Sequence, residues 1–237
     1  MRILHIETGR HLYGGAKQVF FLLKALQTAG ETKNAVACVP GSAIGEACEE
    51  IGIPVFELKI KGELDPRIPS QIRKAASEFG ADILHIHSRK GVDVWGGRVA
   101  RKLGIRSVIS RRVDNPEPAF LARWKYGSYD KVITISEGIK RVLVQEGIAD
   151  EHITVVRSAL DIENYAKPIS REEFEQRFSI PEEALTIACA AQMIPRKGQQ
   201  YLIEAIPQVL QAFPNLRVLL FGKGKTRPLL EEQVRDL

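Results

Sequence analysis

The chain has 237 residues, of which 44% are hydrophobic and 27% charged, and its formal net charge is +5. This composition suits a packed core, and the length exceeds that of one ordinary domain. No run approaches about 18 uninterrupted apolar residues, and the first apolar run contains His5 and Glu7, which do not fit a signal peptide. The sequence therefore predicts a cytoplasmic protein without a membrane-spanning helix. An odd number of cysteines at these spacings indicates neither a disulfide framework nor a metal site: Cys38, Cys48 and Cys189.

Apolar runs alternate with helical patterns along the first 160 residues. The first run, residues 2–7, leads through a loop ending in Gly14-Gly15 to a helix whose apolar residues recur at three- and four-residue spacing. This alternation predicts an α/β fold, with a Rossmann-like, doubly wound parallel sheet. Further strands are expected at residues 35–39, 54–58, 83–87, 107–110, 131–136 and 153–156, with helices centred near residues 47, 75, 99, 123 and 142.

Two histidines stand at the end of the strand expected over residues 83–87. Because side chains alternate across a strand, His85 and His87 point to the same face, and His87 lies nearer the carboxyl rim, where ligands sit in open α/β sheets. A metal site is weakly indicated, because no third ligand follows at suitable spacing. A core histidine and a functional one are equally good interpretations of His85. With a reference pKa of about 6.5, His87 is largely neutral at cytoplasmic pH.

Basic residues are concentrated between Arg89 and Lys125. A solvated helix face and recognition of an acidic acceptor explain this equally well, and a surface for anionic lipid is a further interpretation. Nucleic acid fits less well, because no binding motif accompanies the charge. Arg111, Arg112 and Asp114 directly follow a strand, and two arginines there suit bidentate contacts to a phosphorylated or carboxylated acceptor. Ten basic residues in this segment stand against three acidic ones, Asp93, Asp114 and Glu117.

A polar segment marked by Pro168 and Pro181 follows the first domain. It indicates three parts: a first domain at residues 1–160, an interdomain linker at 161–184, and the start of a second domain at 185–237. In the last part, apolar runs at residues 185–191 and 216–221 flank an amphipathic helix, in which Pro207 predicts a kink or a strained turn. These elements indicate an incomplete second Rossmann-like domain.

The turn before that helix contains Lys197 and Gly198. It lies at the carboxyl end of a strand and the amino end of a helix, where backbone amides and the helix dipole favour a phosphate. On spacing alone, a solvated charge at a helix entry is an equally good interpretation.

Residues 185–237 resemble the donor-side half of the retaining glycosyltransferases of family 4, which have the GT-B fold. The resemblance rests on the segments Ala-Ala-Gln-Met-Ile-Pro-Arg-Lys-Gly, Tyr-Leu-Ile-Glu-Ala and Leu-Leu-Phe-Gly-Lys-Gly. In that family a Gly-Arg-Leu-x-x-x-Lys-Gly segment supplies an Arg and a Lys to the diphosphate of a nucleotide-sugar. Lys197 matches the lysine, whereas Gln192 stands at the arginine position, and a neutral amide does not replace a guanidinium. Arg196 is the neighbouring candidate that would compensate.

The first domain resembles the acceptor-side half of the same family over nearly its whole length. The opening strand, the Gly-Gly loop and the helix have the family's form, although Lys17 stands where an acidic residue is usual. Asp161 matches the Asp of the family's Asn-Gly-Val-Asp segment. Residues 157–159 depart from the Pro-Asn-Gly that precedes it, so this loop is a looser match.

The resemblance implies transfer of a sugar from a nucleotide-sugar to an acceptor hydroxyl with retention, in bacterial lipopolysaccharide or other surface-glycan synthesis, and without a metal or another cofactor. It places His87 near the acceptor and the transferred sugar, as the catalytic residue. The expected partners are the nucleotide-sugar, a glycan or glycolipid acceptor of anionic character, and the inner face of the membrane, but not nucleic acid. The implied binding residues are Arg111, Arg112 and Asp114 for the acceptor, Gly15, Gln192, Arg196, Lys197 and Gly198 for the donor diphosphate, and Gly222 and Gly224 for the nucleotide.

In the family, the base, ribose and sugar of the donor are held mainly by a later Glu-x(7)-Glu segment, and nothing after Gly224 matches it. We therefore expect the 237 residues alone to lack transferase activity, with the last fifty residues mobile or packed against another molecule and the first domain stable. Two alternatives stay open. One is a non-catalytic nucleotide- or sugar-binding module, including a subunit of a split enzyme. The other is an unrelated doubly wound protein, because the fold does not fix function.

Overall fold

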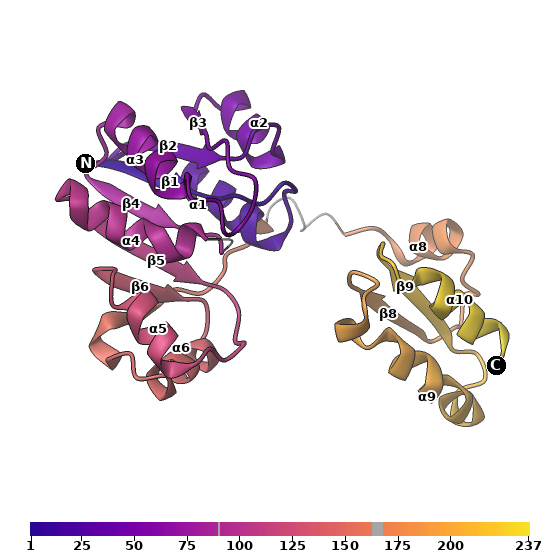
Figure 1. The fold of residues 1–237 in the computed structure, drawn as a ribbon. Helices are drawn as coiled ribbons and strands as arrows, with labels where there is room; N and C mark the ends of the chain where they lie inside the picture. The colour runs from indigo at the N-terminus through magenta and orange to yellow at the C-terminus, as the bar shows by residue number, and fades with distance from the viewer. Residues whose placement is uncertain (90, 163–167) are drawn as a thin grey trace. The chain divides into compact units, whose positions relative to one another are not determined.

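The structure is a computed structural model that describes residues 1–89, 91–162 and 168–237. Contacts divide the chain into two compact units, Met1–Ile162 and Glu163–Leu237 (Figure 1). Across the described residues, no helix is both long enough and apolar enough to cross a membrane.

The first unit is built on a seven-stranded parallel sheet with the order β3-β2-β1-β4-β5-β6-β7. This order places β1 beside β4, so that His5 pairs in register with His85. The direction of strand progression reverses between β1 and β4, and ligands of such sheets bind in the crevice at that point, outside the carboxyl ends of the strands. The strands are β1 (Arg2–Ile6), β2 (Lys33–Cys38), β3 (Val55–Glu57), β4 (Ile83–Ile86), β5 (Arg106–Arg111), β6 (Lys131–Thr134) and β7 (Ile153–Val155).

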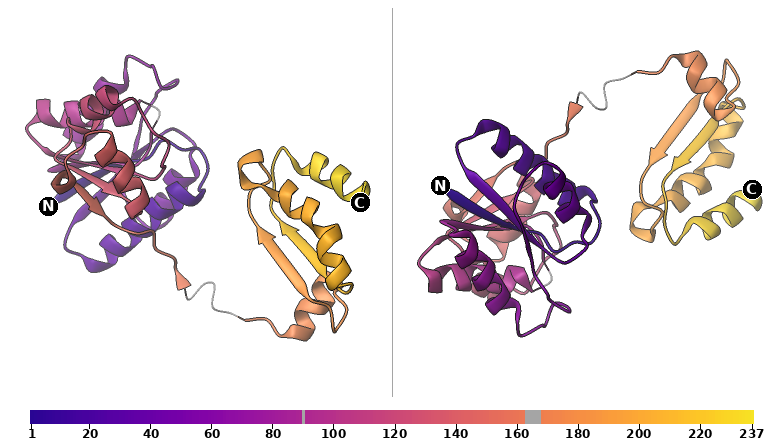
Figure 2. Two further views of the ribbon diagram at one scale, coloured as in Figure 1. Left: turned by 90° about the horizontal axis from the view of Figure 1, so that it is seen from below. Right: turned by 90° about the horizontal axis from the view of Figure 1, so that it is seen from above.

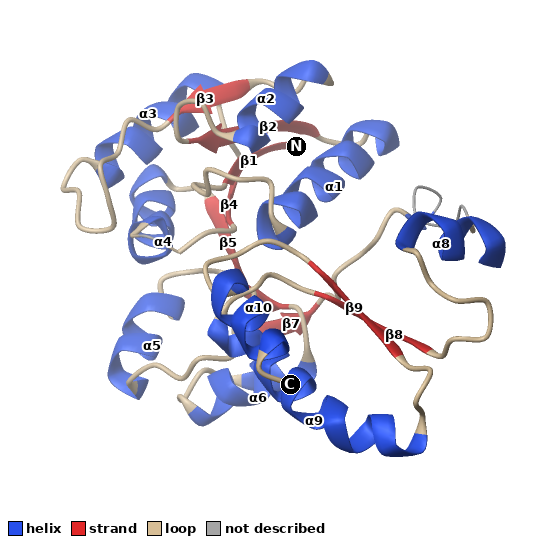
Figure 3. Cartoon of the chain, turned by 90° about the vertical axis from the view of Figure 1, so that its right-hand side faces the viewer, coloured by secondary structure: helices blue, strands red, loops and turns tan. Residues whose placement is uncertain are grey.

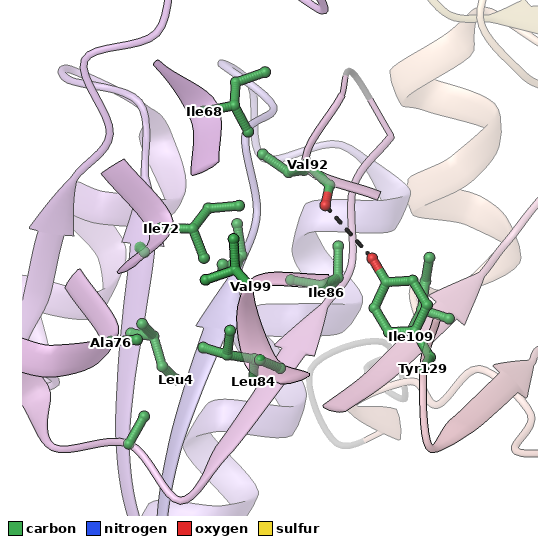
Figure 4. Packing of buried hydrophobic residues seen from close by; sticks show 14 of the residues in the cluster. Leu4, Ile68, Ile72, Ala76, Leu84, Ile86, Val92, Val99, Ile109 and Tyr129 are labelled. Carbon is green, nitrogen blue, oxygen red and sulfur yellow. Dashed lines mark hydrogen bonds between the residues drawn. The ribbon is translucent and has the colours of Figure 1, made fainter. Parts of the chain in front are cut away.

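Helices pack on both faces of this sheet (Figures 1 and 2). On one face, α1 and α2 enclose a cluster that includes Val19, Leu23 and Cys48. On the other, α3 to α6 cover a larger cluster that includes Leu143 and Ile72, the second of which is labelled in Figure 4. The helices are α1 (Gly14–Ala29), α2 (Ala43–Glu50), α3 (Ile68–Phe79), α4 (Val92–Leu103), α5 (Ala119–Tyr126) and α6 (Glu137–Gln145), with a short 3-10 helix η1 (Asp150–His152) before β7.

Two glycines let α4 approach the sheet closely. A Cβ on Gly96 would come within 2.5 Å of Ile86 Cγ1, and a Cβ on Gly97 within 2.6 Å of the Ser128 carbonyl oxygen. Tyr129 fills the space beside them, and its hydroxyl donates to the carbonyl oxygens of Val92, shown in Figure 4, and of Asp93. This contact fixes the distance of α4 from the sheet, and therefore the positions of the side chains on the outer face of the helix.

The second unit has a two-stranded parallel sheet, in which neither strand contains a fully buried residue. Its core is small: Met193, Ile203 and Leu230 are buried, with Leu220 packed against them. Two helices pack against each other beside this sheet (Figure 3). The elements are α8 (Arg171–Phe178), β8 (Thr186–Ala190), the 3-10 helix η2 (Pro195–Lys197), α9 (Gln199–Ala212), β9 (Arg217–Phe221) and α10 (Arg227–Arg235).

The strands and helices predicted from the sequence are all present, and the predicted fold class is confirmed. Pro207 lies inside α9, which continues through it as one helix. The structure departs further from the linker expected at residues 161–184. The ring of Phe178 in α8 lies 5.3 Å from that of Phe221 in β9, and Arg171 Nη2 donates to the Ala184 carbonyl oxygen at 3.0 Å. Residues 168–184 therefore belong to the second unit, and residues 163–167 lie outside the described residues.

Candidate functional site

Three imidazoles meet near the carboxyl edge of the first sheet, where β1 and β4 lie side by side. His5 comes from β1, His85 from β4, and His87 directly follows β4. All three are buried, and one nitrogen of each lies within 4.8 Å of the others. Alternation predicted that His85 and His87 share a face, but His5 was missed. Its position beside them depends on the strand order, which hydrophobic periodicity does not give.

Hydrogen bonds determine which nitrogens of His5 and His87 carry protons. The side-chain nitrogen of Asn34 donates to the carbonyl and hydroxyl oxygens of Thr32, at 3.2 and 2.9 Å, so Asn34 Oδ1 faces His5. This oxygen can only accept, and His5 therefore carries its proton on Nε2, 3.4 Å away. His5 Nδ1 is then an acceptor, and His87 Nε2, at 3.0 Å, donates to it. The orientation of one amide thus fixes two tautomers.

His87 Nδ1 is consequently an unprotonated acceptor, and Arg112 Nη2 lies 3.5 Å from it. Burial, together with the neighbouring His85, His5 and Arg112, holds the pKa of His87 well below its usual range. Burial also lowers the pKa of His5 to about 4, against the opposing effect of its hydrogen bond to Asn34. Both rings are therefore neutral at physiological pH. The contact from Arg112 is long for a hydrogen bond, so a hydroxyl that takes its place can donate a hydrogen bond or a proton to the neutral ring.

The three imidazoles also have the composition and spacing of a metal-ligating group. Their bonding favours a different use. His5 Nδ1 and His87 Nε2 share one proton, and His85 Nε2 contacts Ser110 Oγ at 2.8 Å. A metal ion would break these contacts and would place a second cation beside Arg112. The expectation of a metal-free enzyme remains a prediction.

Arg111 ends β5 and Arg112 directly follows it, and their side chains lie in different surroundings. Arg111 is turned into the protein, with a side chain only 3% exposed. This placement runs against the prediction that Arg111 binds an acceptor, because each of its three nitrogens already has a partner within the fold. Nε donates to the Val113 carbonyl at 2.9 Å, Nη1 donates to the Tyr126 hydroxyl at 2.6 Å and lies 3.4 and 3.8 Å from carboxylate oxygens of Glu117 and Glu146, and Nη2 donates to the Asn115 carbonyl.

Arg112 faces the histidines instead, since neighbouring residues of a strand point to opposite faces. Its Nε is buried and has no hydrogen-bond partner among the described residues, and burial lowers the pKa of the guanidinium, against the opposing charge of Glu7. A Cβ on Gly15 would lie 3.8 Å from Arg112 Cδ, so the start of α1 lies against this side chain. The helix start and the guanidinium together favour an anion. Asp114 is exposed on the following loop.

A cavity of about 370 Å³ adjoins His87 and Arg112. Its other walls come from the strands, from α1 and from residues 157–159. Gln18 of α1 holds residues 157–159 in place with two hydrogen bonds. Its Nε2 donates to the Ala159 carbonyl at 2.6 Å, and its Oε1 accepts from the Ala159 N–H at 2.8 Å. The segment whose sequence departs from the family pattern is therefore held beside the cavity by two hydrogen bonds.

In the second unit, the residues expected to bind the donor diphosphate lie on the loop between β8 and α9. The side chains of Gln192, Arg196 and Lys197 are exposed there. Gly198 has a φ of 72° and leads directly into α9, so that the first amides of the helix follow it. This arrangement presents two cations beside a helix start. The structure brings them together but does not show their ligand.

Gly222 and Gly224 have a packing role in addition to the predicted role in nucleotide binding. A Cβ on Gly222 would lie 1.9 Å from the Ala191 carbonyl oxygen, and a Cβ on Gly224 would lie 2.1 Å from that of Met193. The Met193 N–H also donates to the Lys223 carbonyl at 3.0 Å. Both glycines are therefore needed for the loops after β8 and β9 to join.

We expect acid to destabilise the first unit through His5. The unfolded chain protonates this residue near pH 6.5, whereas the folded chain does so only near pH 4. Between these values the unfolded state binds more protons, so the free energy of unfolding falls as the pH drops, by about 3 kcal/mol for His5 alone. His5→Gln should remove this part of the slope. Urea titrations followed by fluorescence report on the first unit, because both tryptophans of the chain, Trp95 and Trp124, lie in it. The matched control is His11→Gln at an exposed position; equal slopes for His5→Gln and wild type would contradict a neutral, buried His5.

The tautomers can be tested by Asn34→Asp. A carboxylate beside His5 favours its doubly protonated form, in which His5 Nδ1 becomes a donor. His87 must then accept at Nε2 and carry its proton on Nδ1. Long-range ¹H–¹⁵N spectra of histidine-labelled protein should show His87 protonated at Nε2 in the wild type and at Nδ1 in the variant. Asn215→Asp, at an exposed position in the second unit, controls for the added charge. A wild-type His87 protonated at Nδ1 would refute the assignment.

Replacing the two arginines should separate their roles. Arg111→Gln leaves the carboxylates of Glu117 and Glu146 without their cation, which costs about 3–5 kcal/mol for a broken buried pair. Arg112→Gln should change the free energy of unfolding by about 1 kcal/mol or less, because its Nε has no partner to lose. Urea unfolding with tryptophan fluorescence measures both. Equal losses would mean that Arg112 also holds the fold together.

Comparison with known proteins gives a consistent assignment. The sequence profile of Glycosyltransferase Family 4 matches residues 13–164, and the profile of Glycosyl transferases group 1 matches residues 170–237. A GDP-mannose-dependent monoacylated alpha-(1-6)-phosphatidylinositol monomannoside mannosyltransferase from Corynebacterium glutamicum is 30% identical over 82 residues, which are 34% of this chain and 22% of that protein. A D-inositol 3-phosphate glycosyltransferase from Corynebacterium kroppenstedtii is 31% identical over 137 residues, 52% of this chain and 30% of that protein.

These alignments span less than one third of the relatives' lengths. The crystal structure of Anabaena HepE in complex with UDP superposes with a TM-score of 0.82 at 18% identity, over 100% of this chain and 66% of that one. At this identity the likeness concerns the fold alone. The first profile covers more than half of the sequence, and the chain therefore belongs to the glycosyltransferases of family 4.

Proposed function

We propose that the protein transfers a sugar from a nucleotide-sugar to a hydroxyl of a lipid-linked glycan acceptor, with retention of the anomeric configuration, in surface-glycan synthesis. The observation that carries this proposal is the neutral His87, whose unprotonated Nδ1 makes only a long contact of 3.5 Å with the Arg112 guanidinium, near the open start of α1. An acceptor nitrogen for a hydroxyl and a positive region for an anion are what this reaction requires.

In the proposed reaction, the bond between the anomeric carbon and the donor diphosphate breaks, and the diphosphate takes the electron pair. The acceptor oxygen bonds to the same face of the anomeric carbon, and its proton passes to the departing diphosphate. In the first unit, His87 Nδ1 orients the acceptor hydroxyl, while Arg112 and the α1 amides near Gly15 favour a negatively charged group of a substrate. In the second unit, Lys197, with Arg196 and the helix start at Gly198, binds the diphosphate without a metal ion.

The names of the compared proteins support the classes of donor and acceptor. The Corynebacterium glutamicum relative is GDP-mannose-dependent and is named for a phosphatidylinositol mannoside, and HepE was solved with UDP. A lipid-linked acceptor would place the proposed reaction at the inner face of a membrane. We also propose that donor binding needs more strands than β8 and β9, because neither contains a fully buried residue.

The test is transfer of labelled sugar from GDP-mannose, UDP-glucose or UDP-N-acetylglucosamine to lipid extracts, using the 237-residue chain alone and joined to the remainder of a family 4 donor domain. We expect activity only in the joined form. Lys197→Ala should lower kcat/KM for the donor about a hundredfold, which corresponds to about 3 kcal/mol of lost charge stabilisation. Arg217→Ala is the control, because Arg217 begins β9 at the opposite edge of the same sheet.

Equal losses in the Lys197 and Arg217 variants would refute the donor-site assignment. Nucleotide binding without transfer by the joined form would instead favour a non-catalytic binding module. Robust transfer by the 237 residues alone would show that they already hold the donor.

A further inference from the structure

Four large apolar side chains are exposed on two neighbouring helices of the first unit. On α5, Phe120 is 65%, Leu121 43% and Trp124 52% exposed, and on α4, Trp95 is 38% exposed. Phe120 and Leu121 lie four and three residues before Trp124, so these three side chains share one face of the helix. The two helices contact each other, and Figures 1 and 3 show them on the same side of the unit. A contiguous group of exposed aromatic residues marks an interaction surface.

A stacked arginine joins the two halves of this group. The Arg98 guanidinium of α4 lies 3.5 Å from the centroid of the Trp124 ring, and its Nη2 donates to the Trp124 carbonyl at 2.7 Å. Arg101 Nη2 reaches the carbonyl of Gly127, just after α5, at 3.2 Å. The aromatic side chains are therefore held in place together with cationic groups. We name this surface the α4–α5 patch; it comprises Trp95, Arg98, Arg101, Lys102, Phe120, Leu121, Arg123 and Trp124.

The patch is positive because the one acidic side chain of these helices is buried. α4 and α5 contain five basic residues and one acidic residue, Asp93. Asp93 is buried and lies 3.4 Å from the ammonium of Lys125, so this pair cancels and four basic side chains remain. Glu117, before α5, also contacts Lys125, at 2.6 Å. No acidic side chain of either helix is left on the outer face.

We propose that the α4–α5 patch docks this protein onto a membrane that contains anionic phospholipid. Trp and Phe side chains favour the boundary between headgroups and acyl chains, and nearby Arg and Lys side chains favour anionic headgroups. The combination on one surface, without an exposed acid on either helix, fits a lipid surface better than a protein partner, whose interface core is depleted of charge. The proposal rests on the proposed lipid-linked acceptor, because docking brings the acceptor-side unit to the layer in which such an acceptor resides.

The experiment measures binding of the purified chain to vesicles of phosphatidylcholine alone and of phosphatidylcholine mixed with phosphatidylglycerol. Trp95 and Trp124, the two tryptophans of the chain, serve as internal probes. We expect sedimentation with the mixed vesicles only, weakening at high salt, with a blue shift of the tryptophan emission and quenching by brominated acyl chains. The patch variants are Phe120→Ser with Leu121→Ser, and Arg101→Gln with Lys102→Gln. Each should weaken binding about tenfold or more.

The control is Arg73→Gln with Lys74→Gln, which removes the same charge from exposed positions on α3. It should keep binding within about twofold of wild type, since a patch site depends on position rather than on net charge. An equal loss in this control, no binding to the mixed vesicles, or a blue shift from self-association without vesicles would each overturn the proposal. Sugar transfer to a water-soluble acceptor analogue is measured in parallel, with the chain joined to the remainder of a family 4 donor domain. Vesicle binding without any transfer would contradict the proposed function but not membrane docking through the patch. Transfer without vesicle binding would contradict membrane docking but not the proposed function.

Discussion

The buried guanidinium of Arg111 is the contact on which both the candidate site and the outer surface of the first unit depend. It lies against the carboxylates of Glu117 and Glu146, and Glu117 also contacts Lys125. Lys125 in turn reaches Asp93, so charges on β5, α4 and α5 form one connected group. Because a buried charge is costly unless it is paired, these side chains hold one arrangement of the loop after β5 and of the two helices. Arg112, the next residue, is thereby directed to the histidines.

The site separates two tasks that one charged histidine would combine. Arg112 supplies a positive charge that does not titrate near neutral pH, even though burial lowers the pKa of its guanidinium. Its presence also favours a neutral His87, whose Nδ1 then stays available as an acceptor. Asn34 completes the arrangement from a distance, because its amide decides which nitrogen of His5 is protonated. In the proposed function, anion binding and hydroxyl orientation thus belong to different groups with different dependences on pH.

The sequence allowed predictions where a local pattern determines the structure. It did not where the structure depends on contacts between distant segments. Strands and helices followed from apolar spacing, and alternation placed His85 and His87 on one face. His5 required the neighbour relation of β1 and β4. The different surroundings of Arg111 and Arg112 depend on the carboxylate of Glu146, at the end of α6. No sequence motif near β5 indicates that this carboxylate lies there. Likewise, α8 was expected in a linker because it is mostly charged, yet the packing of Phe178 on Phe221 makes it part of the second unit.

The basic segment between Arg89 and Lys125 shows why counting charges could not choose among its interpretations. Folding places seven of the ten basic residues in three environments. Arg111 and Lys125 are buried with carboxylates and serve the fold, and Arg112 faces the histidines. The four basic residues of the α4–α5 patch surround exposed aromatic rings instead. The proposed acceptor site and the proposed lipid surface are therefore not competing explanations of one cluster, because each would use different arginines. The same buried ion pairs that neutralise Asp93 and Glu117 leave the outer surface of α4 and α5 cationic, so the pairing that stabilises the fold also determines the charge of the proposed docking surface.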